Sequence, residues 1–169
     1  SVLADDMPNR AARLVAEKVY WQALYDSAYA GLFVANQGTV VYIDLAAGVD
    51  GDGTAYTTPR NVIPTLVSGN TYLFKQGTTR TGQLSIAVNN VLLGTYYSAN
   101  GNRCFNKSLL FTIDANGGNK CIDAPVTDVK CSGIRFTTTG TYASGGTFGF
   151  YSTPSGGGNN HKEATLRAW

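Results

Sequence analysis

NTYLFKQGTTRTGQLSIAVNNVLLGTYY, residues 70–97, is the stretch that most constrains how this chain folds. Within it, the apolar residues of 84–88 alternate with small or polar ones, so an extended chain places the apolar set on one face. Asn89 and Asn90 interrupt the alternation, and asparagine tolerates the left-handed region better than most residues with a side chain. The apolar alternation resumes at 91–93. Two short strands joined by a two-residue corner are what one coil of a parallel β-solenoid needs, and an ordinary hairpin with an Asn-Asn turn is the alternative.

A longer series of motifs surrounds this stretch. In chain order they read VYID at 41–44, GVDGDGT at 48–54, GNTYLFKQG at 69–77, TGQLSI at 81–86 and LGTY at 93–96. This series resembles the first coils of right-handed parallel β-helix proteins, the pectate-lyase-like superfamily that holds polysaccharide lyases and bacteriophage tailspikes. The resemblance covers about a third of the chain and is strongest to the N-terminal part of a tailspike.

The fold expected from these observations is mostly β, with the first coils of a right-handed parallel β-helix preceded by an N-terminal helix. A β-sandwich is the alternative, because strands every ~8–12 residues also suit that fold. Ile86, Phe111 and Ile134 are candidates for one stacked apolar position, at spacings inside the ~20–45 residue window of solenoid repeats.

The resemblance also implies a function. It suggests the N-terminal segment of a phage tailspike-like protein that binds, and in its full form depolymerises, bacterial surface polysaccharide. The implied partners are that polysaccharide, two further copies of the chain in a homotrimer, and other virion proteins. The implied location is the phage tail. A secreted bacterial polysaccharide lyase or epimerase, and a non-catalytic structural module of a virion or cell surface, are the alternatives.

Residues 1–40 are expected to form a helical capping or attachment segment, and residues 41–169 the start of the β-helix. The helix is predicted over residues 6–30, where a stripe at helical spacing contains Leu14, Trp21, Leu24, Tyr25 and Ala28. This helix is expected to cover the open first coil, or else to pack against copies of itself. Short strands are predicted at 32–34 and 40–43, and a loop at 152–161 is expected to lead into a final strand at 164–169. The chain stops inside this predicted strand, so we expect a truncated C-terminus or a partner chain that covers it.

Two shorter features carry local predictions. Apolar residues at 62–67 follow Pro59 with helical spacing, so one or two helical turns are predicted there. The Asp-Gly-Asp-Gly sequence at 50–53 has oxygen ligands at alternating positions, but no later glutamate completes a calcium-binding loop, and a tight turn enabled by glycine is the better interpretation.

Composition excludes several classes of protein. Charged residues make up only 14% of the chain, whereas it contains 20 glycines and 10 tyrosines, as suits a turn-rich β protein. The net charge is +2 and Lys and Arg do not cluster, so we expect no nucleic-acid partner. No run reaches the ~18 apolar residues of a membrane span, so we expect no membrane partner. Three cysteines are an odd number, which excludes a full disulfide framework; three buried thiols are expected, and one disulfide with a free thiol is the alternative.

Candidate catalytic residues are the carboxylates that lie on or beside predicted strands: Asp114, Asp123 and Asp128. Polysaccharide cleavage commonly uses two carboxylates about 5–9.5 Å apart. Stacking of coils is expected to bring Asp114 close to one of the other two. An aspartate at a turn more often caps its own backbone, so the structural role stands beside the catalytic one. We expect no cofactor and no metal site.

Overall fold

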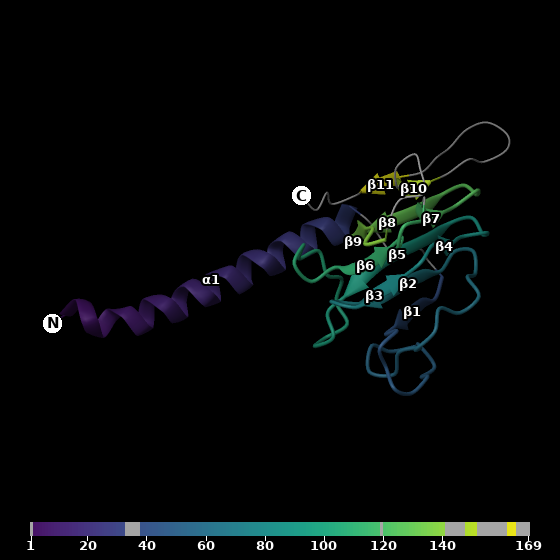
Figure 1. The fold of residues 1–169 in the computed structure, drawn as a ribbon. Coiled ribbons are helices and arrows are strands. Elements are labelled where there is room, and N and C mark those ends of the chain that lie inside the picture. The colour runs from purple at the N-terminus through teal and green to yellow at the C-terminus, as the bar shows by residue number, and fades with distance from the viewer. Residues whose placement is uncertain (1, 33–37, 119, 141–147, 152–161, 165–169) are drawn as a thin grey trace.

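The computed structural model describes residues 2–32, 38–118, 120–140, 148–151 and 162–164 (Figure 1). One long helix, α1 (Val2–Leu32), leads into a body of short strands. The strands are β1 (Val40–Ile43), β2 (Thr71–Lys75), β3 (Thr79–Thr81), β4 (Leu84–Ser85), β5 (Val91–Tyr96), β6 (Phe111–Asp114), β7 (Lys120–Asp123), β8 (Val129–Ser132), β9 (Ile134–Thr137), β10 (Phe148–Tyr151) and β11 (Lys162–Ala164).

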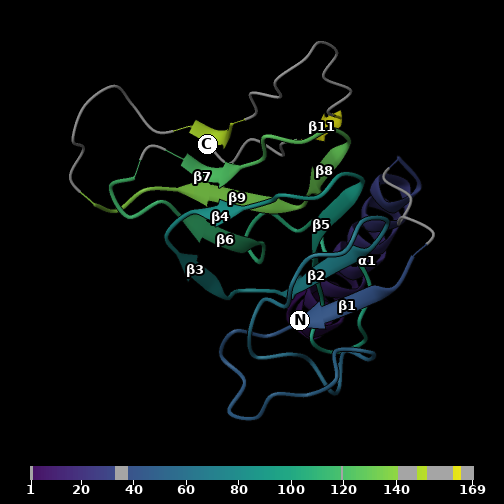
Figure 2. The same ribbon diagram turned by 90° about the vertical axis from the view of Figure 1, so that its right-hand side faces the viewer.

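The strands form three sheets, in the orders β1-β2-β5-β8-β11, β10-β7-β4 and β3-β6-β9. The pairings between these named strands are parallel. From β2 onward, successive strands belong to the five-stranded sheet, then to the β3-β6-β9 sheet, then to the β10-β7-β4 sheet. The same order repeats from β5 and again from β8. Figure 2 shows β1, β2, β5, β8 and β11 one above the other. The chain is therefore mostly β, with parallel sheets preceded by a helix, as the sequence predicts.

The corner predicted at Asn89 and Asn90 is confirmed. β4 and β5 lie on either side of it in different sheets, so the hairpin alternative is wrong. Asn90 has a φ of 56°, in the left-handed region. Its carbonyl accepts a hydrogen bond from the Gly69 amide, and its own amide donates to the Thr127 carbonyl. Corners that precede β2, β5 and β8 thus stack on one another along the body.

The core lies between the three sheets. Phe74 and Phe111 are fully buried, and their rings stack with centroids 4.2 Å apart. Phe111 pairs in register with Ile134, which confirms that part of the predicted stack. Ile86 is wrongly placed in that stack, because its amide donates to Asp123 at the end of β7, in another sheet. The cysteines are buried and free, as expected.

Two local predictions fail. Residues 62–67 form no helix, because Pro64 lacks an amide hydrogen and disfavours helical geometry at the residue before it. The strand predicted at 32–34 is wrong at Leu32, which ends α1, and its other two residues lie outside the described part of the chain. The loop predicted at 152–161 also lies outside it, as does most of the final strand predicted at 164–169.

The free edge of β1 is covered by the loop that follows it. The Tyr42 amide donates to the Gly53 carbonyl, the Arg60 amide donates to the Tyr42 carbonyl, and the Asp44 amide donates to the Arg60 carbonyl. From the sequence, we expected the helix to cover the first coil, or else to pack against copies of itself. In the described residues, α1 instead meets the loops after β5, at Tyr97 and Phe105.

The helix extends away from the strands over most of its length (Figure 1). It is longer at both ends than the predicted span of 6–30. Within the described residues, no helix combines the length and the apolarity that crossing a bilayer requires.

Candidate functional site

Three polar residues form a row where adjacent parallel strands end. Asp44 follows β1, Lys75 ends β2 and Tyr96 ends β5. Ile43 pairs with Phe74, and Lys75 pairs with Tyr96, so the register places the three residues side by side. Because the carboxyl ends of parallel strands share one edge of a sheet, residues far apart in the sequence meet here.

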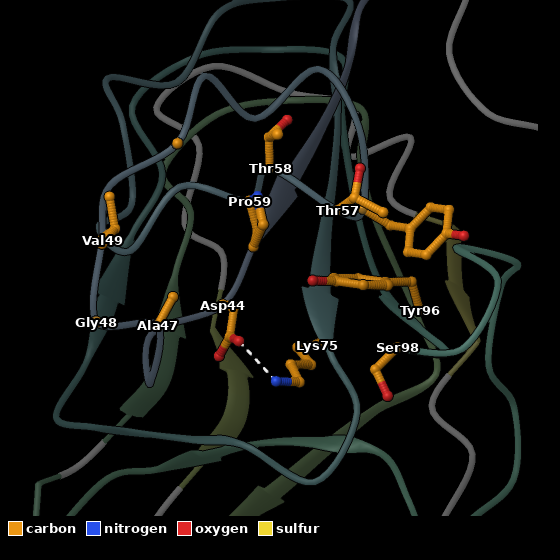
Figure 3. Close-up of a pocket in the computed structure, with 12 residues that line it drawn as sticks. Asp44, Ala47, Gly48, Val49, Thr57, Thr58, Pro59, Lys75, Tyr96 and Ser98 are labelled. Carbon is orange, nitrogen blue, oxygen red and sulfur yellow. Dashed lines mark hydrogen bonds and ion pairs between the residues drawn. The ribbon is translucent and has the colours of Figure 1, made fainter.

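An open cavity of about 540 Å³ lies over this row, and we call it the β1–β2–β5 pocket. The loop after β1 supplies its opposite wall (Figure 3). The residues that line it include Asp44, Tyr56, Thr57, Lys75, Tyr96 and Ser98.

The floor of the pocket carries a paired charge. The Asp44 side chain is only 7% exposed, and its Oδ2 lies 2.7 Å from Nζ of Lys75. Its Oδ1 accepts a hydrogen bond of 3.0 Å from the Ala46 amide. The Lys75 side chain keeps 35% of its surface exposed, so the ammonium group faces both the carboxylate and the solvent of the pocket. The site therefore offers a fixed cation above a buried anion.

Tyr96 lies beneath the pocket as a buried aromatic residue with a polar tip, and only 1% of its surface is exposed. Figure 3 shows its hydroxyl pointing into the pocket, on the same side as Lys75. The ring meets Tyr42 edge to face at 5.1 Å between centroids. Burial, with the nearby charge of Asp44 adding to it, raises the pKa of Tyr96 to about 12. The phenol is therefore neutral at physiological pH and can both donate and accept hydrogen bonds.

The wall of the pocket owes its shape to the Asp-Gly-Asp-Gly turn. Asp52 Oδ1 accepts hydrogen bonds from the Thr54 amide and from the hydroxyls of Thr54 and Thr58. Asp50 Oδ1 lies 2.9 Å from Nε of Arg60. These hydrogen bonds lower the pKa of both carboxyl groups. A side chain at Gly51 would meet the Thr58 carbonyl oxygen at 2.3 Å, so the turn requires glycine there. The carboxylates hold the loop together, which supports the interpretation as a tight turn.

The three predicted catalytic carboxylates are distributed over different sheets. Asp114 ends β6 in the β3-β6-β9 sheet, Asp123 ends β7 in the β10-β7-β4 sheet, and Asp128 precedes β8 in the five-stranded sheet. In the register, Asp114 is flanked by Thr81 and Thr137. The residues that flank Asp123 are a serine and a tyrosine. The strand register thus gives neither aspartate a second carboxylate as its direct neighbour.

Each of these aspartates has local partners. Asp114 accepts hydrogen bonds from the Asn116 amide and from the amide and hydroxyl of Thr139, and these lower its pKa. Asp123 Oδ1 is 3.1 Å from Nζ of Lys120. Asp128 Oδ1 lies 4.0 Å from Nζ of Lys130, and the residue has a φ of 58° at its corner. Asp114 therefore acts as a turn-stabilising residue, and the catalytic roles of all three stay predictions.

Asp44, Lys75 and Tyr96 were not singled out from the sequence as site residues. A signal was nevertheless present, because Asp44, Lys75 and Tyr96 lie in the motifs VYID, GNTYLFKQG and LGTY, which resemble successive parts of β-helix coils. If those segments run parallel, their ends converge, as they do for β1, β2 and β5. Comparison with known proteins found no family model, no curated protein and no solved structure that matches this chain.

Proposed function

We propose that the body of this chain forms the first coils of a right-handed parallel β-helix. The support is the repeated visit to three sheets in constant order, with parallel pairing between successive visits. Parallel strands joined by a crossover within one sheet are connected in a right-handed sense in about 98% of cases. The stacked corners at Gly69, Asn90 and Asp128, all with positive φ, also fit a repeating coil.

Our functional proposal is that the chain is the N-terminal part of a tailspike-like protein and binds bacterial surface polysaccharide in the β1–β2–β5 pocket. The observation that carries it is the row of Asp44, Lys75 and Tyr96 beneath an open cavity. Sugar rings present many hydroxyls and one apolar face, so they suit sites that combine fixed polar groups with aromatic rings. Lys75, partly exposed, would also attract an acidic sugar.

Cleavage of the polysaccharide is proposed for the full-length protein, in the virion context that the resemblance implies. Asp123 and Asp128 are the more exposed of the predicted carboxylates, with side chains 27% and 44% exposed, although each has a lysine partner. Asp114 is buried and is engaged by Thr139. A polysaccharide lyase or epimerase and a non-catalytic virion module are the competing proposals. Release of unsaturated sugars that absorb in the ultraviolet would favour the lyase.

The binding proposal is tested by filling the pocket. Purified bacterial capsular polysaccharides and lipopolysaccharide O-chains are immobilised as a panel, and binding of residues 1–169 is measured by biolayer interferometry. Thr57 is exposed at the pocket, so Thr57→Trp blocks the cavity without removing a core contact. We expect affinity for the bound glycan to fall by roughly tenfold or more, which corresponds to about 1.4 kcal/mol.

The matched control is Thr79→Trp, at an exposed position of β3 that does not line the pocket. It should leave the affinity unchanged. The proposal fails if no polysaccharide in the panel binds, or if the two tryptophan variants weaken binding equally.

A further inference from the structure

The helix α1 carries an unusual amount of exposed apolar surface. Leu14, Val19 and Trp21 are 58%, 64% and 65% exposed, and four more large apolar residues between positions 15 and 25 are at least 38% exposed. Soluble monomers seldom leave contiguous apolar patches of this kind uncovered, and such patches commonly mark interaction sites.

Little of the body supports this helix. At 1.5 Å per residue its 31 residues span about 46 Å. Its polar contacts with the body come from Asp26, which accepts hydrogen bonds from the Tyr97 hydroxyl at 2.6 Å and from the Phe105 amide at 3.2 Å. Tyr29 adds a ring contact with Phe105 at 5.6 Å. A cavity of about 630 Å³ separates Lys18 from the loop at 105–109. Isolated helices gain most of their stability from packing, so α1 needs a lateral neighbour.

One set of mostly apolar residues in α1 follows a seven-residue period, while Val15, Val19, Tyr20 and Leu24 lie outside it. Alternating steps of three and four residues connect the members of one stripe: Ala4, Met7, Ala11, Leu14, Lys18, Trp21, Tyr25, Ala28 and Leu32. In heptad notation the a positions are Ala4, Ala11, Lys18, Tyr25 and Leu32, and the d positions are Met7, Leu14, Trp21 and Ala28. This is the pattern of a coiled-coil seam sustained over four heptads.

The seam lies to one side of the contact at Asp26, and its residues Lys18 and Tyr25 line the cavity beside the loop at 105–109. Asp26 lies about 140° around the helix from Trp21, because each residue turns the helix by about 100°. Trp21 is accordingly the most exposed of the large apolar residues on the helix. The contact at Asp26 thus fixes the helix to its own body while leaving Leu14 and Trp21 of the seam exposed.

The charges of Lys18 and Glu17 indicate which partner fits the seam. Lys18 is the one polar residue of the stripe, and Glu17 stands at the neighbouring g position. When identical helices lie parallel and in register, Lys18 of each chain comes beside Glu17 of the next, whereas a shifted or antiparallel arrangement separates them. A single lysine at an a position is a known means of specifying register.

We propose that α1 associates with α1 of identical chains as a parallel, in-register coiled coil. The partner is a second copy of this chain, and the Lys18–Glu17 contact between chains sets the register. All the β bodies then lie at one end of the coiled coil. This assembly does not depend on the proposed polysaccharide binding, and it is measured without any glycan.

The first experiment is light scattering coupled to gel filtration on residues 1–169. A mass of two or more times 17.9 kDa is expected. Trp21→Glu places a charge in the seam and should weaken association by roughly 100-fold, as loss of a central aromatic contact does. Tyr20→Glu is the matched control, since Tyr20 is an exposed aromatic neighbour at a c position, outside the seam. It should remain associated.

The second experiment tests orientation. Leu14→Cys at a d position should form disulfide-linked dimers on mild oxidation, because equivalent d positions face each other in a parallel coiled coil. Ala16→Cys, at an outward f position, should not. A monomeric wild type overturns the proposal. So does a Trp21→Glu variant that stays associated, or crosslinking that is no greater at position 14 than at position 16.

Discussion

Replacing Lys75 by methionine tests whether the charge pair under the pocket stabilises the fold. Lys75→Met keeps the length and apolar stem of the side chain but removes the ammonium group 2.7 Å from Asp44. The carboxylate keeps its hydrogen bond from the Ala46 amide and loses its ion-pair partner. A buried carboxylate that has lost its partner destabilises the folded state, because water no longer compensates its charge.

The size of the expected loss in stability follows from how far the Asp44 and Lys75 side chains are exposed to solvent. Removing one partner of a fully buried pair costs about 3–5 kcal/mol. The Lys75 side chain is 35% exposed, so solvent in the pocket reaches the carboxylate and screens it. We therefore expect a loss of about 1–2 kcal/mol in the free energy of unfolding. With a urea dependence of about 2 kcal/mol per molar, the midpoint falls by about 0.5–1 M.

The assay is urea unfolding followed by tyrosine and tryptophan fluorescence, at one protein concentration because association would shift the midpoint. The double variant Asp44→Asn/Lys75→Met removes the orphaned charge and should recover most of the loss. Lys107→Met, at an exposed lysine, should change stability by no more than about 0.5 kcal/mol. If Lys75→Met is neutral, or if the double variant is as unstable as the single one, the pair does not hold this edge of the sheet.

Three further outcomes are expected. Asn90→Ala should destabilise by about 1–2 kcal/mol in urea unfolding, because φ there is positive, and Asn90→Gly should cost less. Asp114 has a pKa lowered in the folded state, so its contribution is present above the unfolded-state pKa of about 3.9 and is lost as pH falls through the folded value. Melting temperatures at pH 7 and pH 3 should therefore differ less in Thr139→Val than in the wild type. Burial raises the pKa of Cys104 and Cys121, so dithiobis-nitrobenzoate at pH 8 should react only slowly with the folded protein. After unfolding in urea, the same reagent should react with all three thiols. Fast reaction of the folded protein would contradict their burial.

Local features of the sequence predicted much of the body. The alternation in 84–93 and the break at Asn89 and Asn90 predicted a corner between strands, because strand alternation and left-handed tolerance are properties of neighbouring residues. β1 at 40–43 and the burial of the cysteines were also predictable from short-range pattern and composition. The failure at 62–67 was local too, since Pro64 was present in the sequence and argued against a helix.

The residues of the candidate site were harder to predict from the sequence than the strands. Carboxylates were chosen by residue type and by their closeness to predicted strands, and this selected Asp114, whose oxygens stabilise a turn. Asp44 and Lys75 are 31 residues apart, and nothing between them indicates that they touch. Only the parallel pairing of β1 with β2, in one particular register, brings the two charges together.

The order of residues alone determined that this chain alternates short apolar strands with glycine and asparagine corners, and that a long helix with an apolar stripe precedes them. Those properties act over a few bonds, through backbone sterics and side-chain spacing. Tertiary structure alone decided which strands became neighbours, which loop covers the edge of β1, and that Leu14 and Trp21 of α1 stay exposed. These outcomes depend on register and on burial across the whole body, where a shift of one residue reverses which side chains face inward.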